Sequence, residues 1–136
     1  MSKVAHYLQE HVIGEVMTSA DLRRYFSNDG SVFTVTPSVV LYPRNENDVR
    51  KTARFSWQLA ERGRVIPITA RGFGTDQGGA AIGSGIVMVF PSHMNRIVEL
   101  DGKSGTVIVQ PGVTYGKLQQ TLHTHERYLP PYPASF

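Results

Sequence analysis

The sequence contains no cysteine, and this absence removes several classes of function. Without thiols there is no disulfide framework, no thiolate metal site and no cysteine nucleophile. Residues 1–16 also lack the apolar stretch and cleavage site of a signal peptide. We therefore expect a cytoplasmic protein, either free in the cytoplasm or peripheral to the inner face of the membrane.

Charge of one sign and long apolar runs are also scarce. The sequence has fourteen Lys and Arg residues and eleven Asp and Glu residues. The basic residues are scattered along the chain, so no nucleic-acid partner is expected. The longest unbroken apolar run, residues 86–90, is far shorter than the roughly 18 residues of a membrane helix. We expect no transmembrane segment, and a chain of 136 residues is long enough for one modest core.

Hydrophobic spacing predicts two short helices near the N-terminus. Apolar residues recur every four positions from Val4 to Val12, which is typical of one helix face. A second helix is expected from about residue 20 onward, with Leu22, Tyr25 and Phe26 turned inward.

A strand, helix and strand are expected in succession over residues 39–42, 46–62 and 65–70. This order favours two parallel strands joined by a right-handed crossover. Pro67 cannot donate to a strand ladder, so the second strand is expected near a sheet edge or at a bulge.

The helix over residues 46–62 has the clearest local signals. Asn45 is expected to cap it, with Asp48 three residues on as in a capping box, and Gly63 is expected to end it. Its predicted buried face consists of Val49, Ala53, Trp57 and Ala60.

The remaining chain predicts a buried strand over residues 85–90, a hairpin around residues 101–105 and a helix capped by Thr114. There is no repeat, low-complexity tract or linker. We therefore expect one α+β unit, with a helical lead-in over residues 1–35 and the main domain from residue 36 to 136.

Residues 70–85, ARGFGTDQGGAAIGSG, hold six of the 13 glycines. Glycine permits a positive φ and a close approach to the main chain, and successive free amides bind anions such as phosphate. No Gly-Lys-Ser/Thr follows, and Gln77 stands where a dinucleotide fingerprint needs its third glycine. Loop amides, helped by the Thr75 hydroxyl and the Arg71 charge, could hold a phosphate, and a flexible surface loop is an equally open alternative.

Other side chains give little sign of chemistry. His6 and His11, like His123 and His125, lack the spacing of a chelating pair on a helix, so no metal site is expected. Asp21, Asp29 and Asp48 are interpreted as capping or turn residues. The aromatic residues, Trp57 and Tyr115 among them, are interpreted as core.

Four ordered motifs resemble the FAD-linked oxidases, the family of vanillyl-alcohol oxidase and p-cresol methylhydroxylase. The segment ITARGFGTDQGGA resembles their pyrophosphate loop, and VVLYPRNENDVRKTARFSWQLAERGRVIPITARG resembles their opening strand, helix and strand. Their hairpin with its helix resembles SHMNRIVELDGKSGTVIVQPGVTYGKLQQTL, and their second FAD loop resembles LPPYPAS. GEVMTSADLRRYFSNDGS is similar to the lead-in of the glycolate and D-lactate dehydrogenase branch.

The resemblance implies an FAD-binding fold of the p-cresol methylhydroxylase type and a set of cofactor-binding residues. The pyrophosphate loop would comprise Arg71, Gly72, Phe73, Gly74, Thr75, Asp76, Gln77, Gly78 and Gly79. The segment near the cofactor would comprise Pro111, Gly112 and Val113, and the second loop would begin with Pro131, Tyr132 and Ser135. Covalent members carry histidine where this chain has Thr75, which implies non-covalent FAD. Phe73 replaces a small residue, so its ring must point away from the pyrophosphate or narrow the pocket.

The resemblance also implies a flavin-dependent oxidoreductase that oxidises a 2-hydroxy acid such as D-lactate or glycolate by hydride transfer to FAD. In that family the substrate pocket and the catalytic side chains belong largely to a later domain. We therefore expect this chain to be an N-terminal fragment that is inactive alone, and the electron acceptor stays open. The alternative is an incomplete module that binds the cofactor weakly or not at all.

Overall fold

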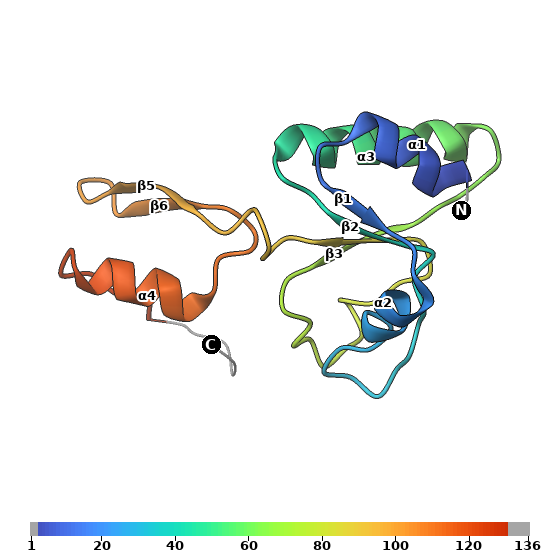
Figure 1. The fold of residues 1–136 in the computed structure, drawn as a ribbon. Helices are drawn as coiled ribbons and strands as arrows, with labels where there is room; N and C mark the ends of the chain where they lie inside the picture. The colour runs from blue at the N-terminus through green and yellow to red at the C-terminus, as the bar shows by residue number, and fades with distance from the viewer. Residues whose placement is uncertain (1–2, 131–136) are drawn as a thin grey trace.

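The computed structural model describes residues 3–130, in which a mixed sheet with flanking helices is followed by a hairpin and a last helix (Figure 1). The elements are α1 (Lys3–His11), β1 (Glu15–Met17), α2 (Ala20–Tyr25), β2 (Val39–Tyr42), α3 (Glu46–Glu61), β3 (Ile68–Arg71), β4 (Ile86–Val89), β5 (Ile97–Asp101), β6 (Thr106–Val109) and α4 (Tyr115–His123). The expected α+β class is confirmed. None of the helices in residues 3–130 is long and apolar enough to cross a membrane.

The main sheet has the strand order β1-β2-β4-β3. Strands β2 and β3 are parallel, as expected, but β4 lies between them and pairs in parallel with both. Strand β3 is at the edge, where Pro67 precedes it and accepts a hydrogen bond from the Ile86 amide at 2.9 Å. Val65, expected in this strand, is 77% exposed, because the strand begins only after the proline.

Helices cover both faces of this sheet (Figure 1). Helices α1 and α3 lie on one face, where Leu41 and Ile86 are fully buried with Leu8 of α1 in the main core cluster. Val40 and Val87 point to the opposite face and pack with Phe26, which follows α2. This alternation is the period of two that a strand imposes on its side chains.

The predicted buried face of α3 is wrong for three of its four residues, and only Val49 packs against the core. Trp57 is 62% exposed, and Ala53 and Ala60 are exposed too. Instead the buried residues of the helix are Asp48 and Thr52, while Phe55 packs against the core. The helix is rotated in this way because the Asp48 carboxylate binds main-chain amides of the α1–β1 loop and of Arg44.

The capping residues of the helices agree better with the predictions from the sequence than the buried faces do. Asn45 caps α3, since its Oδ1 accepts a hydrogen bond from the Asp48 amide at 3.0 Å. Thr114 caps α4 in the same way, with 3.2 Å between its Oγ1 and the Lys117 amide. Tyr25, which we expected to turn inward, is 74% exposed at the end of α2.

The carboxylate of Glu15 joins β1 to two other segments. It pairs with Arg44 and lies 2.7 Å from Nε2 of His93. The hydrogen bond from Arg44 is the largest cause that lowers the pKa of Glu15 to about 2, from an ordinary value of 4.5, and His93 adds to it. Unprotonated Glu15 therefore favours the folded state.

We expect the stability from Glu15 to be complete above about pH 4.5 and to be lost as the pH falls toward 2. The side chain is 41% exposed, so solvent screening limits the effect to about 1 kcal/mol. Urea unfolding of the wild type and of Glu15→Gln at several pH values measures it. The difference between the two curves should shrink toward pH 2, and a difference independent of pH would contradict this assignment.

Candidate functional site

The glycine-rich loop connects the carboxyl end of β3 to the start of β4 (Figure 1). It lies on the face of the sheet that α2 covers, beside the segment that follows α2. Ligands of α/β proteins commonly bind beyond the carboxyl ends of parallel strands. The loop is therefore in a position to bind a ligand.

The first half of the loop presents unused main-chain donors. Within the described chain, none of the amides of residues 72–77 donates a hydrogen bond to a protein group. Four side chains in this stretch, those of Phe73, Thr75, Asp76 and Gln77, belong to exposed residues. A row of free amides next to a left-handed residue is the arrangement that binds phosphate or carboxylate oxygens.

Gly74 supplies that left-handed residue, with a φ of +72°. A Cβ atom at this position would also lie 2.2 Å from Nη2 of Arg71, well inside van der Waals contact. Only glycine satisfies both the backbone angle and the contact. The loop can therefore lie directly on the Arg71 guanidinium.

Arg71 is buried, and its side chain supports the loop from inside. Its Nη1 donates hydrogen bonds to the carbonyl oxygens of Asn28, at 2.8 Å, and Ala81, at 3.2 Å. The guanidinium carbon also lies 5.1 Å from the centre of the Phe26 ring. Burial lowers the pKa of Arg71 from its ordinary value, while the nearby charge of Asp29 raises it. An arginine remains protonated under such a shift, so a positive charge lies beneath the loop.

In the second half of the loop, main-chain amides already donate hydrogen bonds to carboxylates. Oδ2 of Asp76 accepts hydrogen bonds from Gly78, at 2.8 Å, and from Ala80, at 2.7 Å. The Ala81 amide donates to Oδ2 of Asp29 at 3.3 Å. The amide of Gly78, one of the expected pyrophosphate ligands, is therefore not free in this structure.

Residues 28–33 also contact the loop, although no pattern in the sequence indicates this contact. Asn28 and Asp29 bind Arg71 and Ala81, and Gly30 packs against the main chain of residues 75 and 76. We interpreted Asp29 only as a turn residue. It does form a turn, with its Oδ1 2.9 Å from the Ser31 amide, but its second oxygen reaches across 52 residues.

The other expected cofactor residues lie apart from the loop. Gly112 packs against the main chain of residues 90–94, and its amide donates to the Met94 carbonyl at 2.8 Å. In the part of the chain that the structure describes, no hydrogen bond joins residues 111–113 to residues 71–79. Pro131, Tyr132 and Ser135 lie outside the described residues.

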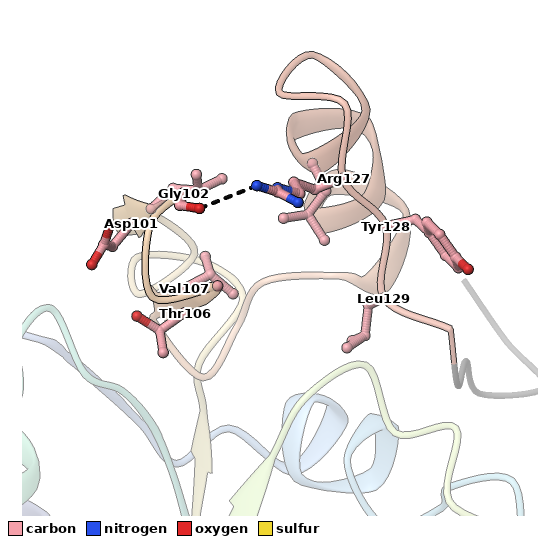
Figure 2. A pocket seen from close by; sticks show the side chains of 10 residues that line it. Asp101, Gly102, Thr106, Val107, Arg127, Tyr128 and Leu129 are labelled. Atoms are coloured by element: carbon pink, nitrogen blue, oxygen red, sulfur yellow. Dashed lines mark hydrogen bonds between the residues drawn. The ribbon is translucent and has the colours of Figure 1, made fainter.

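A pocket between the hairpin and the end of α4 contains none of the expected site residues (Figure 2). Leu100, Val107 and Leu129 are among the residues that line it, and Arg127 crosses it to donate to the Gly102 carbonyl at 3.2 Å. Its lining is mainly apolar, and the Arg127 guanidinium that crosses it is already engaged with the Gly102 carbonyl. Across residues 3–130 no group of three or more His, Cys, Asp or Glu residues is placed to bind a metal.

Comparisons with known proteins point to one cofactor. The family described as FAD binding domain matches residues 37–136. The chain is 37% identical to D-2-hydroxyglutarate dehydrogenase of Escherichia coli over 84% of its own length, and 33% identical to glycolate oxidase subunit GlcD of Bacillus subtilis over 73%. It is 30% identical to mitochondrial D-lactate dehydrogenase [cytochrome] of Kluyveromyces lactis over 74% of its length. The chain spans only 11%, 20% and 17% of these three proteins, respectively.

Solved structures show a similar fold at lower sequence identity. Alkyldihydroxyacetonephosphate synthase superposes on 90% of the chain with a TM-score of 0.73 and 15% identity, and 25% of that protein is covered. The p-cresol methylhydroxylase structure covers 91% of the chain with a TM-score of 0.67 and 18% identity, and 24% of that protein is covered. These similarities establish the fold of the described chain.

Proposed function

The chain belongs to the FAD binding domain family, and from this premise we propose that the free amides of residues 72–77 bind the pyrophosphate of FAD. The observation that carries the proposal is the row of unpaired amides around Gly74, with the buried Arg71 charge beneath it. Hydrogen bonds from main-chain amides to charged oxygens are among the stronger ones in proteins. Donors and charge both fit a diphosphate.

The structure supports some residues of the proposed site more directly than others, depending on whether their amides are free. Gly72, Phe73, Gly74, Thr75, Asp76 and Gln77 have free amides in this structure. Gly78 would contribute only after its amide leaves Asp76. Arg71 would act from below the loop, Gly79 would give the loop its second left-handed glycine, and residues 111–113 would approach from a separate segment.

We propose that FAD is held without a covalent bond through this loop. Thr75 occupies the position where covalent relatives carry histidine, and a threonine hydroxyl is not a comparable nucleophile at neutral pH. Phe73 is 63% exposed, so its ring does not lie in the core beneath the loop. Because no covalent bond would hold the cofactor, denaturation of the FAD-loaded protein should release all of the flavin.

For the whole protein we propose oxidation of a 2-hydroxy acid to the 2-oxo acid. The names of the three relatives support this class of substrate, because D-2-hydroxyglutarate, D-lactate and glycolate are all 2-hydroxy acids. When bound, FAD supplies the acceptor for the two electrons that leave the substrate. The residues described here bind and orient the cofactor, and we propose that substrate-binding groups lie in another domain. We also propose a cytoplasmic location, since the chain has no cysteine to require an oxidising compartment.

We expect the purified full-length protein to be yellow and to lose its visible flavin absorbance when a substrate is added without oxygen. D-2-hydroxyglutarate, D-lactate and glycolate are the acids to compare, with L-lactate as the control of chirality. Bleaching by at least one of the three is predicted. Retention of FAD without bleaching by any of them would reject the proposed substrates and favour a module that only binds the cofactor.

A further inference from the structure

Residues 28–33, which precede the family match, lie against the proposed FAD loop. We propose that this segment orients the amides that bind the pyrophosphate, and that Gly30 is the positioning residue. The inference rests on the proposed function, because it names the part of the chain that shapes the same site.

Gly30 is in close contact with two carbonyl groups of the loop. A Cβ atom at position 30 would lie 2.9 Å from the carbonyl oxygens of both Thr75 and Asp76. These oxygens therefore face the Gly30 main chain, at a distance that leaves no room for a methyl group. The contact ties the N-terminal segment to the middle of the free-amide stretch.

Because the peptide bond is planar, the contact of Gly30 with the two carbonyl groups also determines the direction of the Asp76 and Gln77 amides. In a trans peptide unit the carbonyl and the N–H point in opposite directions. The Thr75 carbonyl shares its unit with the Asp76 amide, and the Asp76 carbonyl shares its unit with the Gln77 amide. Since both carbonyls face Gly30, both amides point away from it, and neither has a partner in the described chain.

The segment that carries Gly30 is itself hydrogen-bonded to the start of the loop and to a second point ten residues later. Asn28 accepts a hydrogen bond from Arg71, where the loop begins, and Asp29 accepts one from Ala81, ten residues later. The hydrogen bond from Ser31 to Asp29 is the largest cause that lowers the pKa of Asp29. A charged Asp29 also lies close enough to Arg71 to interact with its charge. The two residues that directly precede Gly30 therefore hold it against the loop.

Gly30→Ala isolates this contact, because the φ of Gly30 is outside the left-handed range and alanine adds only a methyl group. That methyl must displace the carbonyls of Thr75 and Asp76 and so rotate their peptide units. We expect the Kd of the full-length apoprotein for FAD to rise at least about tenfold, the factor given by one weakened hydrogen bond to a charged group. Quenching of flavin fluorescence on titration measures the Kd.

Two further readouts separate positioning from simple loss of structure. The ³¹P NMR signals of bound FAD should shift in Gly30→Ala, because the pyrophosphate loses part of its donor set. The far-UV circular dichroism spectrum of the Gly30→Ala apoprotein should match that of the wild type, because the substitution moves peptide units of one loop and leaves the helices and strands in place. Gly102→Ala is the matched control, because a Cβ atom at position 102 has open space around it and the glycine has no left-handed φ.

A second variant keeps the inference testable if Gly30→Ala does not fold. Asp29→Asn retains the shape of the side chain but loses its charge and one acceptor, and we expect it to weaken FAD binding about threefold. Asp101→Asn is its control, because Asp101 forms a similar exposed turn in the hairpin with the Lys103 amide at 2.8 Å. Wild-type Kd values and ³¹P shifts in the folded variants would overturn the inference. A wild-type protein that binds no FAD would instead refute the proposed function.

Discussion

Gly74→Val is expected to weaken FAD binding by at least about a hundredfold, the loss of two hydrogen bonds to a charged group. Valine is strained at a φ of +72°, and its Cβ atom would lie 2.2 Å from the Arg71 guanidinium. The loop must therefore move off Arg71, and its amides lose their common direction. Fluorescence titration of the full-length apoprotein with FAD measures the effect.

Gly63→Val is the matched control for this change. Gly63 also has a left-handed φ, of +78°, but a Cβ atom there meets nothing within 4 Å, and the residue follows α3, outside the glycine-rich loop. Valine at position 63 should lower stability through backbone strain and leave the Kd for FAD unchanged. Equal affinity of folded Gly74→Val and wild type would show that this loop does not hold the cofactor.

Asp48→Ala is expected to lower the free energy of unfolding by about 3–5 kcal/mol. Asp48 is fully buried, and its carboxylate accepts hydrogen bonds from the amides of Ile13, Gly14 and Arg44 at 2.9–3.0 Å. Alanine would leave these three donors without their acceptor. The change would also detach α3 from the α1–β1 loop. Urea unfolding of the full-length protein measures the loss.

Two further variants test this expectation: Asp48→Asn as an intermediate change and Asp101→Ala as a control. Asparagine keeps one acceptor oxygen, so its loss of stability should lie between those of the wild type and Asp48→Ala. Asp101 accepts a similar amide hydrogen bond but is only half-buried at the end of β5, and its replacement should change the unfolding midpoint little. A loss for Asp48→Ala no larger than that for Asp101→Ala would contradict the structural role of Asp48.

Local signals predicted the elements of the fold better than their arrangement. The caps at Asn45 and Thr114 and the parallel direction of β2 and β3 are confirmed, because each depends on nearby residues or on strand order. Strand β1 has only three residues, too few for an alternating pattern. The rotation of α3, which exposes Trp57, follows from contacts of Asp48 with residues 34 and 35 positions away, which helical periodicity does not register.

The site was predictable in part for the same reason. Glycine spacing and the family resemblance led to the proposal that the loop around Gly74 binds the cofactor, and the comparisons confirm the family. The spacing did not show that Arg71 turns inward or that Asp76 binds the Gly78 amide, because both depend on the folded path of the loop. No pattern in the sequence indicates a role for Gly30, because its contact with residues 75 and 76 arises from tertiary structure.

The central claim is that main-chain amides of residues 72–77 bind a pyrophosphate, and the most direct measurement compares FAD with riboflavin. Both carry the same flavin ring, but riboflavin has neither the pyrophosphate nor the adenosine of FAD. Titration of the wild-type full-length apoprotein should give a saturable site for FAD and at least about hundredfold weaker binding of riboflavin. Equal affinity for the two, or no binding of FAD, would contradict the claim.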